Sequence, residues 1–187
     1  NMVVMTPSDE EECRKMLTTA YHIDGPSAVR YPRGVGPGVA TEKQLTALPL
    51  GKGEIRRRGQ RIALLAFGSM LSPCLDAADE LDATVANMRF VKPIDRELII
   101  GLAAEHSLLI SVEENVLIGG AGAEVARVLE EIDSPARLVR LGIPDRFIDH
   151  GDQARLLAEI GLDREGIIRA TREHAAFAPD ECVAANQ

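Results

Sequence analysis

The sequence has 187 residues, a length typical of one ordinary domain or of one domain with part of another. Hydrophobic residues make up 45% of it, aromatic residues only 3%, and tryptophan is absent, so the core must be built from aliphatic side chains. The 21 lysines and arginines against 29 aspartates and glutamates give a formal net charge of −8. An acidic chain without a dominant basic face is a poor candidate for binding a nucleic-acid backbone, so we expect no nucleic-acid partner.

The three cysteines, Cys13, Cys74 and Cys182, lie far apart and form no Cys-x-x-Cys pair. Their odd number and wide spacing favour reduced thiols over a disulfide framework or a zinc site. No apolar run approaches the roughly 20 residues needed to span a bilayer, and the first residues lack the charged-then-apolar pattern of a signal peptide. We therefore expect a soluble cytoplasmic protein without a membrane partner.

Residues 1–33 predict a strand, a helix and a second strand. The chain opens on the apolar run 2–5 without a polar lead-in, as in a segment of a larger protein. Ser8 and Glu11 have the spacing of a capping box, in which each side chain satisfies the other's free backbone amide. Apolar residues then recur at helical spacing, and residues 28–31 have the pattern of a strand. Because one βαβ unit cannot cover both faces of a sheet, this unit needs a partner.

The rest of the chain predicts an α/β fold. Residues 34–50 contain glycine and proline without a clear period and indicate a linker. Two strand-like runs, 52–57 and 61–67, are separated by Arg58-Gly59-Gln60, which predicts a hairpin. Helices are then expected at 71–81, from Asp95 to 105, and at 121–131, 153–160 and 163–174, with strands at 83–88, 107–112 and 136–141. This alternation predicts a mostly parallel sheet with helices on both faces and one antiparallel edge strand, followed by a tail at 175–187.

A glycine-rich loop, Gly119-Gly120-Ala121-Gly122, follows a predicted strand and opens a predicted helix. Such a loop can direct backbone amides at a phosphate. However, the carboxylates of Glu113, Glu114 and Glu124 lie nearby in the sequence; they would repel a phosphate and could occupy the amides themselves. We therefore favour a close-packed structural turn over a phosphate site. Because adjacent strand residues point in opposite directions, a joint acid–base or metal role for Glu113 and Glu114 is not expected.

The remaining polar residues show no catalytic pattern. The four histidines are dispersed without metal spacing, so each is interpreted as a surface or capping residue; they are His22, His106, His150 and His174. A run of arginines flanks the predicted hairpin and is interpreted as a solvated edge that deters strand pairing; it comprises Arg56, Arg57, Arg58 and Arg61.

Arg30 and Arg33 bracket Tyr31-Pro32 at the carboxyl end of a predicted strand. Ligands of open α/β sheets bind outside the carboxyl ends of the strands, and arginine offers a planar fork suited to phosphate. The pattern alone leaves two interpretations open, because a surface arginine at this place could equally pair with Asp24 or Glu10.

Several segments together resemble the 1-deoxy-D-xylulose-5-phosphate synthases, thiamine-diphosphate enzymes of the transketolase family. Residues 25–34 read Gly-Pro-Ser-Ala-Val-Arg-Tyr-Pro-Arg-Gly, and residues 88–95 read Met-Arg-Phe-Val-Lys-Pro-Ile-Asp. Val-Glu-Glu-Asn at 112–115 leads into the glycine-rich loop, and Gly-Ile-Pro-Asp and Gly-Leu-Asp follow at 142–145 and 161–163. Order and spacing are similar to the C-terminal portion of these synthases from about residue 2 to residue 174.

The resemblance implies that residues 1–33 end a pyrimidine-binding domain, that 34–50 are a linker, and that 51–174 form a transketolase C-terminal domain. It implies a transferase that joins pyruvate to glyceraldehyde 3-phosphate with loss of carbon dioxide, uses thiamine diphosphate and Mg²⁺, and forms a homodimer. Of the family's substrate-binding residues one is carried over, since Arg33 matches the arginine that holds the phosphate of glyceraldehyde 3-phosphate. No catalytic, cofactor-binding or metal-binding residue is expected in this chain, which should be inactive alone.

The family motif is not followed throughout, because Val35 stands after Gly34 where many relatives have asparagine, so the local loop can differ. Two alternatives remain open at this point. The chain could be the equivalent part of another thiamine-diphosphate enzyme, such as a transketolase or a 2-oxo-acid dehydrogenase β subunit. It could also be a non-catalytic dimerisation module.

Overall fold

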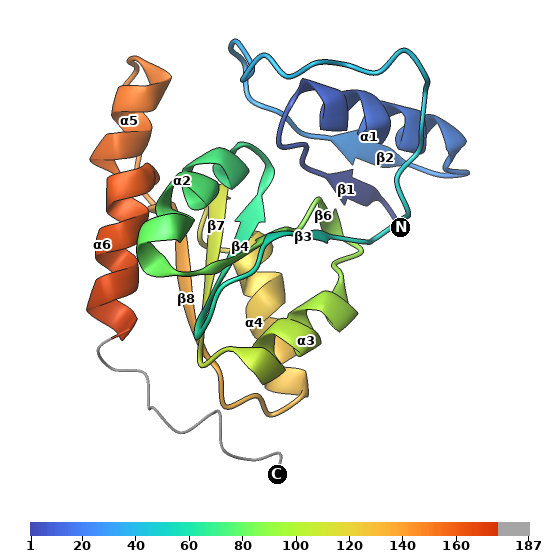
Figure 1. Ribbon diagram of the computed structural model, residues 1–187. Helices are drawn as coiled ribbons and strands as arrows, with labels where there is room; N and C mark the ends of the chain where they lie inside the picture. The colour runs from blue at the N-terminus through green and yellow to red at the C-terminus, as the bar shows by residue number, and fades with distance from the viewer. Residues whose placement is uncertain (176–187) are drawn as a thin grey trace.

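A five-stranded sheet flanked by helices forms the main body of the computed structural model, which describes residues 1–175 (Figure 1). Its strand order is β3-β5-β4-β7-β8. In chain order the strands are β3 (Glu54–Arg57), β4 (Ile62–Phe67), β5 (Thr84–Asn87), β7 (Leu108–Val116) and β8 (Arg137–Ile143). Neighbouring strands among β5, β4, β7 and β8 run parallel, and β3 is the antiparallel edge strand. The predicted α/β arrangement is confirmed.

Helices cover both faces of this sheet. One face carries α2 (Leu71–Leu81), which follows the short 3₁₀ turn η1 (Gly68–Met70), together with α6 (Arg164–Ala175). The other face carries α3 (Arg96–Glu105) and α4 (Ala121–Glu131). Because successive side chains of a strand point to opposite faces, Leu64 packs toward α2 and α6 while Leu65 packs toward α3 and α4.

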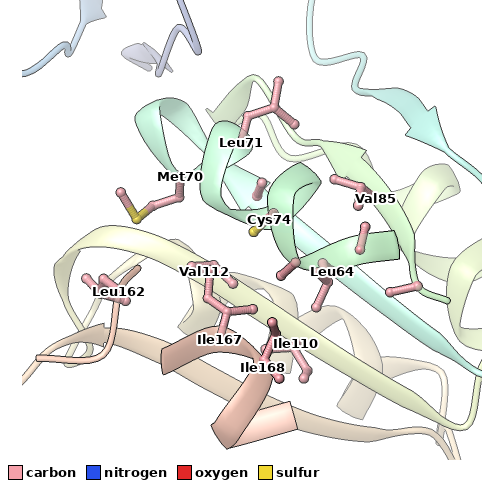
Figure 2. Close-up of a cluster of buried hydrophobic side chains, with 14 of the residues drawn as sticks. Leu64, Met70, Leu71, Cys74, Val85, Ile110, Val112, Leu162, Ile167 and Ile168 are labelled. Atoms are coloured by element: carbon pink, nitrogen blue, oxygen red, sulfur yellow. The ribbon is translucent and has the colours of Figure 1, made fainter. Parts of the chain in front are cut away.

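The core is mainly aliphatic, as the composition requires, although Phe67 and Phe90 are also buried in it. Figure 2 shows the cluster on the α2 side, where side chains of the strands meet those of both helices. The strands contribute Leu64, Val85, Ile110 and Val112; α2 contributes Leu71 and Cys74; α6 contributes Ile167 and Ile168. Strands buried on both faces explain the continuous apolar runs of the sequence.

A second, three-stranded sheet contains the N-terminal part of the chain. It has the order β2-β1-β6, built from β1 (Val3–Met5), β2 (Ser27–Val29) and β6 (Phe90–Lys92), with α1 (Glu10–His22) between the first two. The parallel pairing of β1 with β2 confirms the predicted βαβ unit. Strand β6 was not predicted, because three residues are too few to show a period. It pairs antiparallel with β1, so the partner that the unit needs comes in part from farther along the chain.

The predicted hairpin between residues 52–57 and 61–67 is wrong. Strands β3 and β4 are not neighbours, because β5 lies between them and pairs with both. The loop that joins β3 to β4 crosses the start of β5, where Gly59 N donates to Thr84 Oγ1 at 3.0 Å and Gln60 N donates to the Asp82 carbonyl at 2.8 Å. The long-range pairing with a buried strand therefore outweighs the local turn signal.

Helix starts were predicted with mixed success. Asp95 caps α3 as expected and accepts from Leu98 N at 3.1 Å. At α1 the predicted Ser8–Glu11 box lies one residue too early. Asp9 is the capping residue and accepts from Glu12 N at 2.8 Å, while the Glu12 carboxylate accepts from Ser8 N at 2.8 Å.

Residues 30–53 contain no helix or strand and pass over α1. Gly38 N donates to Glu10 Oε1 at 2.8 Å, and Leu48 N donates to Thr19 Oγ1 at 2.8 Å. The division at residues 33 and 50 stays a prediction. Residues 176–187, where most of the tail was expected, lie outside the described part of the chain. Across residues 1–175, no helix combines the length and the apolar character that crossing a membrane would require.

Candidate functional site

The arginine loop, residues 30–34, follows β2 and lies against the carboxyl ends of β7 and β8 (Figure 1). It lines a cavity of about 500 Å³ together with Glu114 of β7 and with α5 (Gln153–Glu159). The wall opposite the loop is largely apolar and is formed by Ile143, Ile148, Leu156, Leu157 and Ile160. A polar, cationic loop facing an apolar wall at the carboxyl ends of strands is a typical arrangement for a small-molecule site.

Arg33 is exposed at this cavity. Within residues 1–175 its guanidinium makes no hydrogen bond or ion pair, with Asp24 and Glu10 included. Glu10 is instead bonded to the amide of Gly38. The five N–H donors of Arg33 are therefore free to meet an anionic ligand.

Arg30 is engaged differently. Its Nη2 donates to the main-chain carbonyl of Glu114 at 2.5 Å. This contact joins the end of β2 to the end of β7, across 84 residues of sequence. Of the two arginines that sequence reasoning singled out, one is thus held by the protein and the other is open to a ligand.

Glu114 connects two further elements. Its carboxylate accepts from Ser69 Oγ at 2.6 Å and from Gln153 Nε2 at 3.0 Å. Ser69 lies in η1, after β4, and Gln153 is the first residue of α5, directly after the capping residue Asp152. Sequence reasoning missed both residues, because no local pattern marks a serine and a glutamine that meet a distant glutamate.

A second cavity, of about 670 Å³, lies on the other side of the arginine loop. Tyr31 and Pro32 line both cavities, as do Gln153 and Leu157 of α5. The arginine loop is therefore a partition between two open spaces.

The glycine-rich loop is a structural turn, as favoured from the sequence. Glu113 is buried, and its two carboxylate oxygens accept from Ala121 N at 2.7 Å and from Gly122 N at 2.8 Å. Burial raises the pKa of the Glu113 carboxyl, an effect that these two amide hydrogen bonds oppose. Glu113 thus faces α4 while Glu114 faces the arginine loop, in the opposite directions expected of strand neighbours.

Residues 1–175 do not fit the diphosphate–metal part of a thiamine-diphosphate site. No group of three or more histidine, cysteine, aspartate or glutamate side chains among them could hold a metal ion. The amides at the start of α4 are occupied by Glu113, whose charge would repel a diphosphate. We therefore assign no binding of the diphosphate or its metal ion to residues 1–175, and no reaction step that would depend on it.

The histidines fit the surface or capping interpretation. His106 is the residue that ends α3, where its backbone N–H donates to the Leu102 carbonyl, and its side chain is buried with both ring nitrogens near partners inside the protein. Nε2 lies 2.8 Å from Thr84 Oγ1 and Nδ1 lies 2.9 Å from the Leu102 carbonyl. His22 and His150 are exposed, and His174 is half-buried beside Arg137.

The cysteines and the arginine run have no partners that suggest a functional site in residues 1–175. Cys74 is fully buried, which raises the pKa of its thiol far above the ordinary range, and Cys13 is half-buried. Cys182 lies outside the described residues. In the arginine run, Arg57 binds Asp79 at 3.0 Å and Arg58 binds Glu105 at 3.2 Å, as expected of a solvated edge.

Comparison with known proteins agrees with this fold. The family model described as "Transketolase, C-terminal domain" matches residues 51–167, more than half of the chain. The chain therefore belongs to the transketolase C-terminal domain family.

The particular relatives are 1-deoxy-D-xylulose-5-phosphate synthases, as the sequence motifs indicated. The chain is 61% identical to the synthase of Nitrosomonas europaea over 173 residues, which are 92% of this chain and 28% of the relative. It is 64% identical to the synthase of Dechloromonas aromatica over 172 residues, which are again 92% of this chain and 28% of the relative. The expected resemblance to the C-terminal portion of these synthases is confirmed, and the chain spans less than a third of their length.

Among solved structures, one described as "Split gene transketolase, inactive beta4 tetramer" matches with a TM-score of 0.82 and 30% identity. The match covers 96% of this chain and 59% of that chain. The likeness thus includes the βαβ unit as well as the main sheet.

Proposed function

We propose that the full-length protein is a 1-deoxy-D-xylulose-5-phosphate synthase, a transferase that condenses pyruvate with glyceraldehyde 3-phosphate and releases carbon dioxide. The observation that carries the proposal is the identity of 61% and 64% to two such synthases over 92% of this chain. The product would serve isoprenoid, thiamine and pyridoxal biosynthesis. Thiamine diphosphate and Mg²⁺ belong, in this proposal, to residues in the rest of the full-length protein.

Within this chain, Arg33 is the residue we assign to substrate. Three features support it: an exposed guanidinium without a partner in residues 1–175, a place at the carboxyl end of β2, and the family motif. The planar fork of arginine matches the oxygens of a phosphate group. Arg30 is the weaker candidate, because its Nη2 is already used by the Glu114 carbonyl.

We further propose that the protein is a cytoplasmic homodimer and that the chain alone is inactive. The name of the split-gene relative, an inactive β4 tetramer, describes copies of one subunit that assemble without activity. Fully exposed apolar side chains, Val35 and Phe147, are compatible with an assembled surface here.

The alternative assignments are less well supported. Two of the solved transketolases that match are 30% and 17% identical, which is about half the identity of the synthases or less. A non-catalytic dimerisation module would not need an exposed arginine such as Arg33, which has no partner in residues 1–175 and lies beside a cavity.

The test is the reaction of the full-length protein with thiamine diphosphate and Mg²⁺. Pyruvate and glyceraldehyde 3-phosphate should together give carbon dioxide and deoxyxylulose phosphate. The matched control supplies a ketose phosphate donor in place of pyruvate. Transfer from that donor, without decarboxylation of pyruvate, would identify a transketolase and reject the proposal.

A further inference from the structure

We infer that Glu114 and Gln153 are positioning residues that hold the arginine loop at both of its ends and thereby direct Arg33 at its ligand. Neither residue touches the guanidinium of Arg33 in the described contacts, so their action is through the loop. The identity of the ligand rests on the proposed function, but the anchoring itself does not.

The first anchor holds the start of the loop. Arg30 Nη2 donates to the carbonyl of Glu114 at 2.5 Å, at the carboxyl end of β7. The neighbouring main chain is also fixed, because Arg30 N donates to the Met5 carbonyl at 2.8 Å. The loop therefore leaves β2 from a defined point.

The second anchor holds the end of the loop. A β-carbon built on Gly34 would lie 3.3 Å from Gln153 Oε1, so the glycine backbone packs closely against this side chain. The other end of the same amide, Nε2, donates to Glu114 Oε1 at 3.0 Å. Gln153 thus lies between the two, hydrogen-bonded to the Glu114 carboxylate and packed against the backbone of Gly34.

The carboxylate of Glu114 is itself fixed. Its second oxygen accepts from Ser69 Oγ at 2.6 Å. The carbonyl of Glu114 therefore serves the first anchor, and its carboxylate serves the second. A single residue at the end of β7 connects to both ends of the loop.

The loop needs such anchors because it lies between two cavities, of about 500 and 670 Å³. Tyr31 and Pro32 border open space on both sides, so packing alone leaves the loop room to move. Proline fixes its own φ near −65°, which stiffens the approach to Arg33 but does not fix the loop to the sheet. Because the loop is held at Arg30 and at Gly34, the Arg33 side chain between them can point in only a restricted range of directions.

The decisive variant is Gln153→Ala, which removes the second anchor without changing any charge near the cavity. Gln60→Ala is the matched control, since Gln60 is also exposed but lies at the opposite ends of the strands. A reciprocal exchange, Glu114→Gln with Gln153→Glu, keeps the net charge and rebuilds an amide–carboxylate pair in reverse. Gln153→Glu alone places two carboxylates side by side.

The first measurement does not depend on enzymatic activity. Limited proteolysis of the 1–187 chain by trypsin reports the opening of the Arg33–Gly34 bond, quantified by mass spectrometry. Gln153→Ala and Gln153→Glu should speed this cleavage by about 3- to 10-fold, as expected when the hydrogen bond that holds Gln153 against Gly34 is lost. Gln60→Ala and the reciprocal exchange should match the wild type.

The second measurement uses the full-length enzyme and compares glyceraldehyde 3-phosphate with glyceraldehyde, which lacks the phosphate. The preference for the phosphorylated acceptor should fall about 3- to 10-fold in Gln153→Ala, with the KM for pyruvate unchanged. Unchanged cleavage at Arg33–Gly34 would overturn the anchoring, and faster cleavage with an unchanged acceptor preference would overturn the positioning role. A wild-type enzyme without turnover would reject the proposed function instead, and the proteolysis would still decide the anchoring.

Discussion

The carboxylate of Glu12, in α1, accepts a hydrogen bond from Arg89 Nε at 2.7 Å, and both side chains are largely withdrawn from solvent. The Glu12 side chain is 7% exposed and that of Arg89 is 17% exposed. Asn87 Nδ2 donates to the same carboxylate at 2.9 Å. These contacts tie the βαβ unit to the last residue of β5 and to the turn that follows it, so a buried ionic contact links the three-stranded sheet to the five-stranded one.

Glu12→Gln should destabilise the chain by about 2–3 kcal/mol, because it leaves the Arg89 charge with one partner fewer in a buried place. The matched control is Glu54→Gln, which removes the other partner of Arg89. The Glu54 side chain is 46% exposed, so its loss should cost at most about 1 kcal/mol. Urea unfolding of both variants measures the difference. Equal stabilities would show that the Glu12 contact contributes no more than a surface pair.

A feature of the fold could be predicted from the sequence where it depends on residues close together in the chain, and not where it depends on contacts between distant residues. Helices 71–81 and 121–131 were predicted with the bounds that α2 and α4 have, since an apolar period over three turns is a local signal. The neighbour of β3 could not be predicted, because strand order is decided by pairing across the sheet. The burial of His106, which caps the end of α3, could not be predicted for a similar reason, because its partner Thr84 lies 22 residues away.

Two glycines that lie in helices should respond in opposite ways to alanine. A β-carbon on Gly122, at the start of α4, would lie 2.5 Å from the buried Ser111 Oγ and 3.2 Å from the Arg140 side chain. Gly122→Ala should therefore cost about 1–3 kcal/mol, as expected for overpacking. Gly101 lies on the exposed side of α3 with open space around it, so Gly101→Ala should stabilise by about 0.5–1 kcal/mol.

Thermal unfolding of the two glycine variants beside the wild type measures both effects. The midpoint should fall for Gly122→Ala and rise for Gly101→Ala. A Gly122→Ala protein as stable as the wild type would mean that Ser111 can move aside, and the close approach of α4 to β7 would not be required.

The contact between α2 and α6 should depend on pH. Glu80 accepts from Arg164 at 2.6 Å and from Arg172 at 2.7 Å, and the hydrogen bond from Arg164 is the main reason that the pKa of Glu80 is lowered. A lowered pKa in the folded state means that the ionised carboxylate stabilises the fold above the ordinary value of 4.5. This contribution is lost as the pH falls through the lowered pKa.

The comparison that isolates this effect is wild type against Glu80→Gln, followed by thermal unfolding across pH. The wild type should have the higher midpoint at neutral pH, and the two midpoints should converge well below pH 4.5. High salt should narrow the difference at neutral pH, because the pair is at the surface and is screened. A difference that stays constant with pH would assign the effect to packing of the side chain and not to its charge.

The candidate site was predicted in one part and missed in another. Arg30 and Arg33 stood out because a rigid Tyr-Pro step holds them near a strand end, which is a local pattern. The anchors of the loop did not, since Gln153 and Glu114 are 39 residues apart and meet only when α5 folds back over the ends of β7 and β8. A glutamine next to a helix cap has no signature that distinguishes an anchor from an ordinary surface residue.

Arg33 itself gives the most direct test of the substrate assignment. In the full-length enzyme Arg33→Ala should lower the efficiency with glyceraldehyde 3-phosphate by about 10- to 100-fold, because a charge-assisted contact contributes about 1.5–3 kcal/mol. The KM for pyruvate should change little, since pyruvate carries no phosphate. Arg33→Lys should recover only part of the loss, because an ammonium group keeps the charge but lacks the planar fork.

Arg56→Ala is the control for Arg33→Ala, because Arg56 is an exposed arginine on the edge strand β3, in neither of the cavities beside the arginine loop. Its kinetics should match the wild type with both substrates. Steady-state kinetics with each substrate varied in turn separates the two KM values, and unfolding of Arg33→Ala should show unchanged stability since its side chain makes no described contact. If Arg33→Ala used glyceraldehyde 3-phosphate as well as the wild type does, the phosphate would have to bind elsewhere. Arg30 would then be the next residue to test, because Arg30→Ala would remove a second positive charge from the same cavity.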